Sequence, residues 1–268
     1  MRPGREDGFA LLIVLWALVL ISLLATQVTA AGRGAVQVAA NLRGAAVAEA
    51  AADGAVHEAI FRMLDPSDAG WRADGQLRRL PMPRGDIAVR LDDQAGKVNP
   101  NLASTGLLTE LLRELGADTQ TATRVAAAIA DWRAPTATAM PNGAKASEYR
   151  NAGRDYGPPN APIQSIGELG GVLGMTPALL GRLAPHLSLF HDGDPDPGLA
   201  DPVTLRALRR SRNAQQLAPG PRGGVRLVAV TATANQANGT TFTRRAIVRV
   251  GEGRSRPFQI LEWGMVEE

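Results

Sequence analysis

Apolar residues are concentrated near the start of the chain, where an uncharged run extends from Phe9 to Gly32. At a helical rise of about 1.5 Å per residue, about 20 apolar residues cross the hydrocarbon core of a bilayer. A helix also satisfies its own backbone hydrogen bonds in lipid. The pattern predicts a membrane helix over 9–32, followed by a chain polar enough to form a soluble domain.

Helical periodicity continues beyond the apolar run. No proline occurs over 33–65, alanine is frequent, and Val56, Ile60 and Met63 share one helical face. Pro66 cannot continue the hydrogen-bond ladder. The pattern predicts one long helix, half in lipid and half packed on a globular domain. A membrane helix, a glycine-containing linker and a separate helix form the alternative.

Alternating apolar and polar positions, which are typical of half-buried strands, occur in two separate parts of the chain. The first part follows a loop over 67–85, in which a short strand is an open alternative. It contains a strand over 86–91, with Lys97 and Val98 starting a return strand. The second part contains strands over 225–233, 241–250 and 258–263, the first two forming a hairpin.

Residues 102–190 show helical rather than strand periodicity. Leucines from Leu107 to Leu115 form the apolar face of a helix that ends near Gly116, and a second helix covers 121–132. A loop rich in proline and glycine follows over 134–162.

Capping signals then mark two short helices. Ser165 with Glu168 forms a capping-box pattern, and Thr176 precedes a proline at the first helical position. One more helix is predicted over 201–212, before the second group of strands.

The order of these elements predicts an α+β fold. A long N-terminal helix and an antiparallel sheet form one unit, and an all-α domain is inserted between the strands. The predicted parts are a leader over 1–8, a membrane segment over 9–32, a helix with the first strands over 33–101, the inserted helical domain over 102–200, and a helix with the C-terminal sheet over 201–268.

Composition narrows the chemistry. The chain of 268 residues has no cysteine, which excludes disulfides and cysteine-based metal sites. Its formal net charge is only +3, and the arginines are scattered rather than clustered, so a nucleic-acid footprint is weak.

Residues for catalysis are not grouped in any known pattern. His57, His186 and His191 lie far apart and form no ligand pair, and no serine has a nucleophile-elbow context. The alternating aspartates of HDGDPDPG (191–198) lack the downstream glutamate of a calcium loop. The sequence therefore predicts that the protein is not an enzyme.

The charged leader MRPGREDG resembles the leaders that a prepilin peptidase removes from type IV pilin-like proteins. The resemblance implies cleavage between Gly8 and Phe9, with methylation of the new N-terminus. Secretory cleavage at the small residues 29–32 is the alternative, although the apolar run is long for a signal peptide and the leader carries Glu6 and Asp7.

The whole chain resembles the type II secretion system protein K family, also called general secretion pathway protein K, whose members are minor pseudopilins. The stretches that carry the resemblance are GFALLIVLWALVLISLLA, DDQAGKVNPN, AIADWRAP, PNAPIQSIGELGGVLGMTPALLGRLAPHLSLF and the terminal FQILEW. It implies a pilin-like helix and sheet, with an inserted domain of the SAM-like or helix-hairpin-helix-like kind.

The fifth residue after the expected cleavage is Ile13. Most pilin-like proteins have a glutamate there, whose carboxylate is thought to pair with the N-terminal amine of the subunit ahead, whereas protein K characteristically lacks it. A buried carboxylate without a partner is costly. A non-acidic residue therefore suits a subunit with nothing ahead of it, at the tip of the filament.

The resemblance also implies partners and a location. The expected partners are the minor pseudopilins I and J, with H as a further candidate, together with the major pseudopilin and the prepilin peptidase. The protein would cross the inner membrane once, with its globular domain in the periplasm, and would prime a pseudopilus for the export of folded proteins.

Calcium is the one cofactor that the resemblance raises. Members of this family commonly have acids after the DW motif, but here only Asp131, Glu148 and Asp155 are candidates. Calcium takes about six to eight oxygen ligands, so these three acids form a weak set. We expect no cofactor, with calcium as an open alternative.

A membrane-anchored DNA-binding protein, acting in DNA uptake, is the alternative function. The segment VNPNLASTGLLTELLRELG with ATRVAAAIADW resembles a helix-hairpin-helix module. Its hairpin LGADTQTA lacks the paired glycines that expose backbone N–H groups to phosphate, and the segment is mixed in charge. We therefore expect no nucleic-acid partner.

Overall fold

The fold is mixed α and β in a computed structural model that describes residues 7–211, 226–251 and 257–265. The helices are α1 (Asp7–Leu64), α2 (Thr105–Glu114), α3 (Thr119–Arg133), α4 (Ala146–Asn151), α5 (Pro177–Leu183) and α6 (Pro202–Ser211), with 3-10 turns η1 (Ile166–Gly171) and η2 (Ala184–His186). The strands are β1 (Asp74–Met82), β2 (Gly85–Asp93), β3 (Arg226–Gln236), β4 (Thr241–Val250) and β5 (Phe258–Met265).

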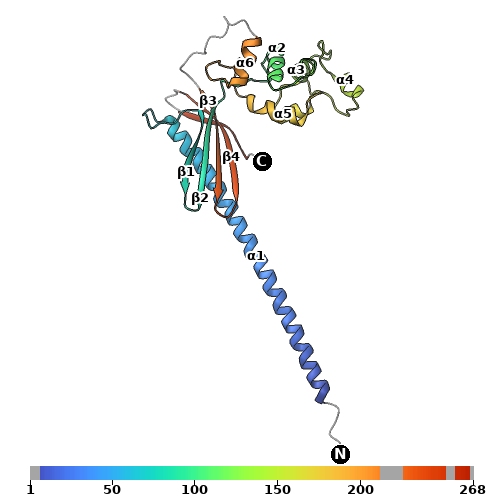
Figure 1. Ribbon diagram of the computed structural model, residues 1–268, viewed down its shortest axis with the longest axis vertical. Helices are drawn as coiled ribbons and strands as arrows, with labels where there is room; N and C mark the ends of the chain where they lie inside the picture. Colours follow the sequence, from blue (N-terminus) through green and yellow to red (C-terminus); the bar gives the residue numbers. More distant parts are fainter. Residues whose placement is uncertain (1–6, 212–225, 252–256, 266–268) are drawn as a thin grey trace, which may run out of the picture.

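Helix α1 packs on the sheet at its C-terminal end, and we call the part of α1 that extends away from the sheet the shaft (Figure 1). The remaining helices lie beyond the sheet, at the opposite end from the shaft (Figure 1). Helix α1 runs unbroken for 58 residues and ends before Pro66, which confirms the single long helix over the interrupted alternative. The sheet first covers it at Gly44, and Ala48, Ala52 and Val56 are fully buried. Only the C-terminal third of α1 is therefore packed within the chain.

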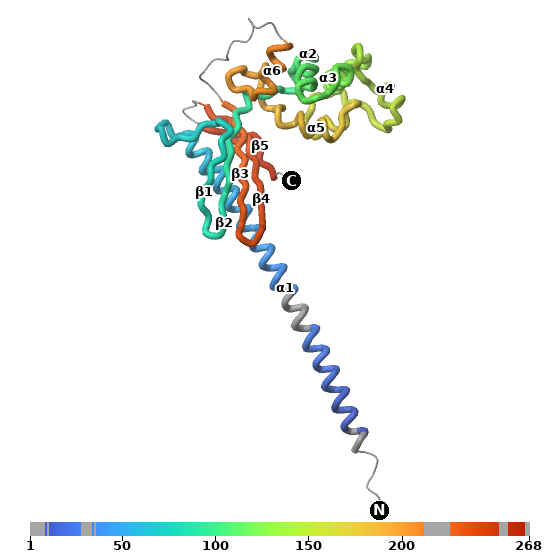
Figure 2. Tube along the Cα trace, in the orientation of Figure 1, coloured from blue at the N-terminus to red at the C-terminus, as the bar shows by residue number. Residues whose placement is uncertain are grey.

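All five strands form one antiparallel sheet in the order β1-β2-β3-β4-β5, with β5 at the edge beside β4 (Figure 2). One face packs on α1. Val89, Val230 and Val248 from the three central strands are at most 1% exposed and belong to the same apolar cluster as the buried face of α1. The antiparallel sheet with a long helix confirms the predicted α+β class.

The first hairpin differs from the sequence prediction. The partner of β2 is β1, which begins at Asp74 in the segment that we expected to be mostly loop. Val98 makes only an isolated bridge with Leu187, so the predicted return strand at 97–98 is wrong. Pro81 obscured β1 in the sequence, and an edge strand tolerates proline because one side of its backbone needs no partner.

A block of helices interrupts the sheet between β2 and β3, which are nonetheless paired neighbours. Its own apolar cluster is centred on α2 and α3, where Leu107, Leu111 and Ile129 are at most 1% exposed. We call residues 98–211 the helical block.

The last helix, α6, packs with the helical block, whereas the sequence predicted that it belongs with the sheet. Helix α6 packs on α2, with Ala207 and Leu208 in the cluster of the helical block. Arg206 and Arg210 both pair with the buried carboxylate of Glu114, at 2.6 and 2.5 Å. By its contacts α6 lies with the block, whereas the boundary predicted at residue 200 placed it with the sheet.

Capping explains where the helices of the block begin. The side chains of Ser104, Asp118 and Thr176 accept hydrogen bonds from the first turns of α2, α3 and α5. The capping box expected at Ser165 is wrong, because its side chain does not cap and Glu168 accepts from Gln164 instead.

Two predicted element ends lie outside the described residues. These are Arg212 after α6 and Val225 before β3.

Candidate functional site

The predicted processing site lies at the start of α1. Gly8 and Phe9 belong to its first turn, and the side chains of Phe9 and Ile13 are 67% and 53% exposed. This end of the helix is the one farthest from the sheet (Figure 1). The leader residues 1–6 lie outside the described part, and the roles of Gly8, Phe9 and Ile13 in processing and assembly stay predictions.

The N-terminal half of α1 exposes apolar side chains in every direction. The large apolar residues from Leu11 to Leu24 are 52–75% exposed. Within the described residues, no helix is both long enough and apolar enough to span a membrane. Further along, Val36, Val38 and Leu42 are also exposed, by 58–70%. The described protein does not itself cover this part of α1.

Arg244 of β4 fastens the sheet to α1. Its guanidinium donates to Asp53 at 2.5 Å and to Glu49 at 2.7 Å, and lies over the rings of Phe242 and Trp263. Burial alone would lower the pKa of Arg244, but the hydrogen bonds to the two carboxylates more than offset it and raise that pKa. The arginine therefore stays charged and holds the sheet in one position on the helix.

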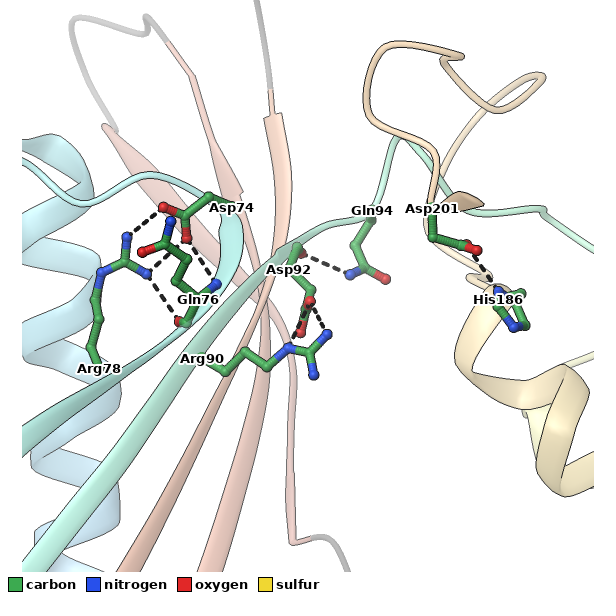
Figure 3. A network of polar contacts seen from close by, with 8 residues as sticks. All are labelled: Asp74, Gln76, Arg78, Arg90, Asp92, Gln94, His186 and Asp201. Atoms are coloured by element: carbon green, nitrogen blue, oxygen red, sulfur yellow. Dashed lines mark hydrogen bonds and ion pairs between the residues drawn. The ribbon is translucent and has the colours of Figure 1, made fainter. Parts of the chain in front are cut away.

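Two separate groups of polar contacts flank the junction between the sheet and the helical block, at the end of β2 (Figure 3). Arg90 pairs with Asp92 at 2.9 Å, and the backbone oxygen of Asp92 accepts from the fully buried Gln94 at 2.9 Å. Beyond Gln94, His186 of η2 lies 2.9 Å from the carboxylate of Asp201.

Asp201 caps α6. Its side chain accepts from the backbone N–H groups of Val203 and Thr204 and from the hydroxyl of Thr204. Burial alone would raise the pKa of Asp201, but these hydrogen bonds and the one with His186 lower it. Asp201 thus joins the start of α6 to η2.

A hollow of about 480 Å³ lies at the same junction, lined in part by Asp93, Lys97 and His186. Burial lowers the pKa of Lys97 and raises the pKa of Asp93. Both pKa shifts favour the neutral forms, because desolvation is the largest cause of each.

Two asparagines of the quoted motif DDQAGKVNPN tie the helical block together. The Asn101 side chain makes a two-way bridge to the backbone of Ile163, at 2.9 and 2.8 Å. Asn99 donates to the backbone oxygen of His191 at 2.8 Å and accepts from the N–H of Asn101. These roles were not predicted from the sequence. The two asparagines that flank Pro100 in this motif were the signal that could have shown them.

The three weak calcium candidates are not brought together. The buried carboxylate of Asp131 accepts from the N–H of Met140, and Glu148 accepts from the N–H of Lys145 and from Ser147. Asp155 is exposed. Among the described residues, no group of three or more acidic, histidine or cysteine side chains could hold a metal ion.

The three histidines lie in three different places. His57 contacts its own helix and the ring of Trp263, His186 pairs with Asp201, and His191 contacts the backbone of Asp194. An open groove of about 960 Å³ beside α3 is lined by mixed residues, among them Arg133, Met140 and Asp192. The three histidines therefore do not come together in one site.

Comparison with known proteins finds a family match that covers most of the helical block. Residues 87–192 match the family model of type II secretion system (T2SS) protein K. The predicted resemblance is confirmed. The matched segment runs from β2 through Asp192, so it contains most of the helical block and both asparagine bridges.

A curated relative agrees with this family match. The chain is 28% identical over 212 residues to the type II secretion system protein K of Klebsiella pneumoniae, covering 70% of this chain. The match spans 64% of the length of that relative, slightly under two thirds.

The fold is also that of a solved chain. It matches a chain in the crystal structure of the GspK-GspI-GspJ complex from the enterotoxigenic Escherichia coli type 2 secretion system, with a TM-score of 0.62 and 18% identity. The match covers 85% of this chain and 98% of the other. At this identity the likeness concerns the fold.

Proposed function

We propose that the protein is a minor pseudopilin of a type II secretion system and forms the tip of its pseudopilus. The observation that carries the proposal is the combination of a protein K domain over 87–192 with a 58-residue helix that extends far beyond its own sheet. The exposed apolar shaft needs other helices or lipid around it. A filament built of such helices supplies both.

The N-terminal part of α1 is the proposed anchor in the inner membrane, before and during assembly. The run from Phe9 to Gly32 contains no charged residue, and its described large side chains are apolar and exposed. Small residues such as Ala17 and Ala25 would permit neighbouring helices to approach closely in lipid. The sheet and the helical block would then lie in the periplasm.

Maturation would remove the leader after Gly8. A prepilin peptidase would cut before Phe9, and the new N-terminus would be methylated, as the resemblance of MRPGREDG to prepilin leaders implies. The long apolar run argues against ordinary secretion.

Two features support the position at the tip. Ile13 offers no carboxylate for the amine of a preceding subunit. The helical block lies beyond the sheet, at the opposite end from the anchor (Figure 1). The helical block adds bulk that would obstruct a subunit stacked above it.

The proposed partners are the minor pseudopilins I and J, with H and the major pseudopilin as later additions. A match to a chain from a complex that contains GspI and GspJ supports this choice. Contact would be made by lateral packing of helices, through exposed residues such as Val36 and Leu42 of α1. No catalytic step is proposed.

The mature N-terminus is the first measurement. The full chain would be expressed with a prepilin peptidase and its N-terminal peptide identified by mass spectrometry, with Gly8→Val as a variant that blocks cleavage and Gly4→Val as the matched control. A peptide beginning at Phe9 in the parent and in Gly4→Val, but not in Gly8→Val, supports the proposal. An uncleaved Met1, or cleavage at 29–32, would remove the filament mechanism.

Co-purification tests the tip assignment separately. Tagged full-length protein would be co-expressed with I and J from the same secretion system, and the complex isolated in detergent. We expect one copy of each subunit in the complex. Recovery of long filaments with this chain at internal positions would contradict the tip assignment, even if the leader is cut as expected.

The DNA-binding alternative has no support from the comparisons. In the turn between α2 and α3, Asp118 also occupies the N-terminus of α3 and accepts from the N–H of Thr121 at 2.9 Å. A carboxylate at that position repels a phosphate.

A further inference from the structure

The loop after α3 is closed on a buried lysine. Lys145 is 3% exposed, and its ammonium group donates to three oxygens: the backbone oxygens of Asp131 and Ala134 at 2.6 and 2.8 Å, and the side-chain oxygen of Asn160 at 2.6 Å. An ammonium group has three N–H donors and no acceptor. The three oxygens therefore satisfy it completely.

The C-terminal end of α3 favours a cation for a second reason. Asp131 lies in the last turn of α3, and Ala134 is its C-terminal cap. The last carbonyls of a helix have no partner within the helix, and they lie at the negative end of its dipole. A cation at this point satisfies two of them and gains from the dipole.

A buried carboxylate lies at the same end of α3. The Asp131 side chain is on the same residue whose carbonyl binds the ammonium, and it accepts from the N–H of Met140 at 3.1 Å. Gly143 lies so close that an added Cβ would be 1.9 Å from this carboxylate. The loop thus wraps one anion and one cation at the end of α3.

Calcium does not fit these residues. It would need about six to eight oxygens, whereas Asp131, Glu148 and Asp155 do not converge. The oxygens that do converge are two backbone carbonyls and one amide oxygen, and all three are bonded to the lysine.

We propose that the ammonium group of Lys145 is the resident cation of the helical block and takes the place that a bound metal ion would have at the end of α3. The segment 134–162 then closes on a covalently attached charge, without calcium. Its order is set when the chain folds and does not depend on the calcium concentration outside the cytoplasm.

Hydrogen exchange of the full-length protein in detergent tests the proposal. Peptides from 134–162 would be followed by mass spectrometry in millimolar calcium chloride and in EDTA, for the parent, for Lys145→Met and for Arg150→Met. Arg150 is an exposed cation of the neighbouring α4, so its variant is a matched control for loss of one positive charge.

We expect the same exchange in calcium and in EDTA for the parent and for Arg150→Met. Lys145→Met should exchange faster over 134–162 by about tenfold or more, because three charge-assisted hydrogen bonds are lost and the oxygens at the end of α3 lose their donor. Slower exchange of the parent in calcium would overturn the proposal, as would a Lys145→Met profile equal to that of Arg150→Met. The comparison of calcium with EDTA remains decisive if Lys145→Met does not fold.

Discussion

The guanidinium Nε of Arg244 lies 2.5 Å from a carboxylate oxygen of Asp53, although the two residues are 191 positions apart in the chain. One residue is on β4 and the other on α1. Their side chains are 10% and 34% exposed. The pair therefore fixes where the sheet sits on the long helix, and the direction in which the shaft leaves the globular part.

Breaking this pair should destabilise the protein clearly. We expect Arg244→Met to lower the free energy of unfolding by about 2 kcal/mol, because two carboxylates of α1 lose their counter-charge. Urea unfolding of the full chain in detergent, followed by tryptophan fluorescence, measures this loss.

The exposed pair of Arg62 and Glu58 on the same helix serves as control, with side chains 41% and 38% exposed. Arg62→Met should cost about 0.5 kcal/mol or less. In a double-mutant cycle, Arg244→Met and Asp53→Asn should be non-additive, and full additivity would contradict a direct coupling.

The cap at Asp201 predicts a dependence on pH. Its pKa is lowered in the folded protein. The stabilisation by its carboxylate is therefore fully present above the unfolded pKa of about 3.9, and it is lost as the pH falls through the lower folded value. Asp201→Ala should cost about 1 kcal/mol at pH 7, and the difference from the parent should shrink below about pH 4.

Urea midpoints across this pH range check the prediction, with the exposed Asp155→Ala as control. A gap that stays constant down to pH 2 would show that the charge of Asp201 does not matter.

The two-way bridge of Asn101 should be sensitive to a single-atom change. Asn101→Asp replaces the group that donates to the backbone oxygen of Ile163 by one that repels it. We expect a loss of about 1–3 kcal/mol and faster hydrogen exchange around Ile163. Asn151→Asp, at the exposed end of α4, should change neither quantity, and equal effects of the two variants would argue against the bridge.

Gly143 should accept no side chain. An added Cβ would lie 1.9 Å from the buried carboxylate of Asp131, so Gly143→Ala should lower the unfolding temperature. An added Cβ at Gly181 in α5 would meet open space. Gly181→Ala should therefore raise the unfolding temperature, since alanine favours a helix by about 1 kcal/mol over glycine. Thermal unfolding distinguishes the two opposite signs, and a stable Gly143→Ala variant would contradict the described closure of the loop.

Local patterns predicted most of the secondary structure correctly. The unbroken α1, the ends of α2 near Gly116 and of α1 before Pro66, and the start of α5 at Thr176 all depend on residues within one or two helical turns. The strands β3 to β5 were visible for the same reason, because alternation is a local signal. The short α4 was missed, and the edge strand β1 was predicted only as an open alternative within a loop, since neither has a clear period of its own.

The candidate sites divide in the same way. Gly8, Phe9 and Ile13 could be predicted from the sequence because a processing signal is linear, and their roles stay predictions. The partners of Lys145 and Asn101 were not, because each binds backbone oxygens or N–H groups that any residue could supply. These backbone groups do not depend on the type of residue, so the sequence does not show which residue will supply them.

The long helix, the antiparallel sheet and the family resemblance follow from the amino-acid sequence alone, because hydrophobic periodicity, caps and motifs act over short stretches of chain. The pairing of β1 with β2, the packing of α6 on the helical block, and the contacts of Arg244 and Lys145 became visible only in the folded chain. These depend on contacts between distant segments, and the free energy of such contacts comes from burial and geometry that exist only once the chain has folded.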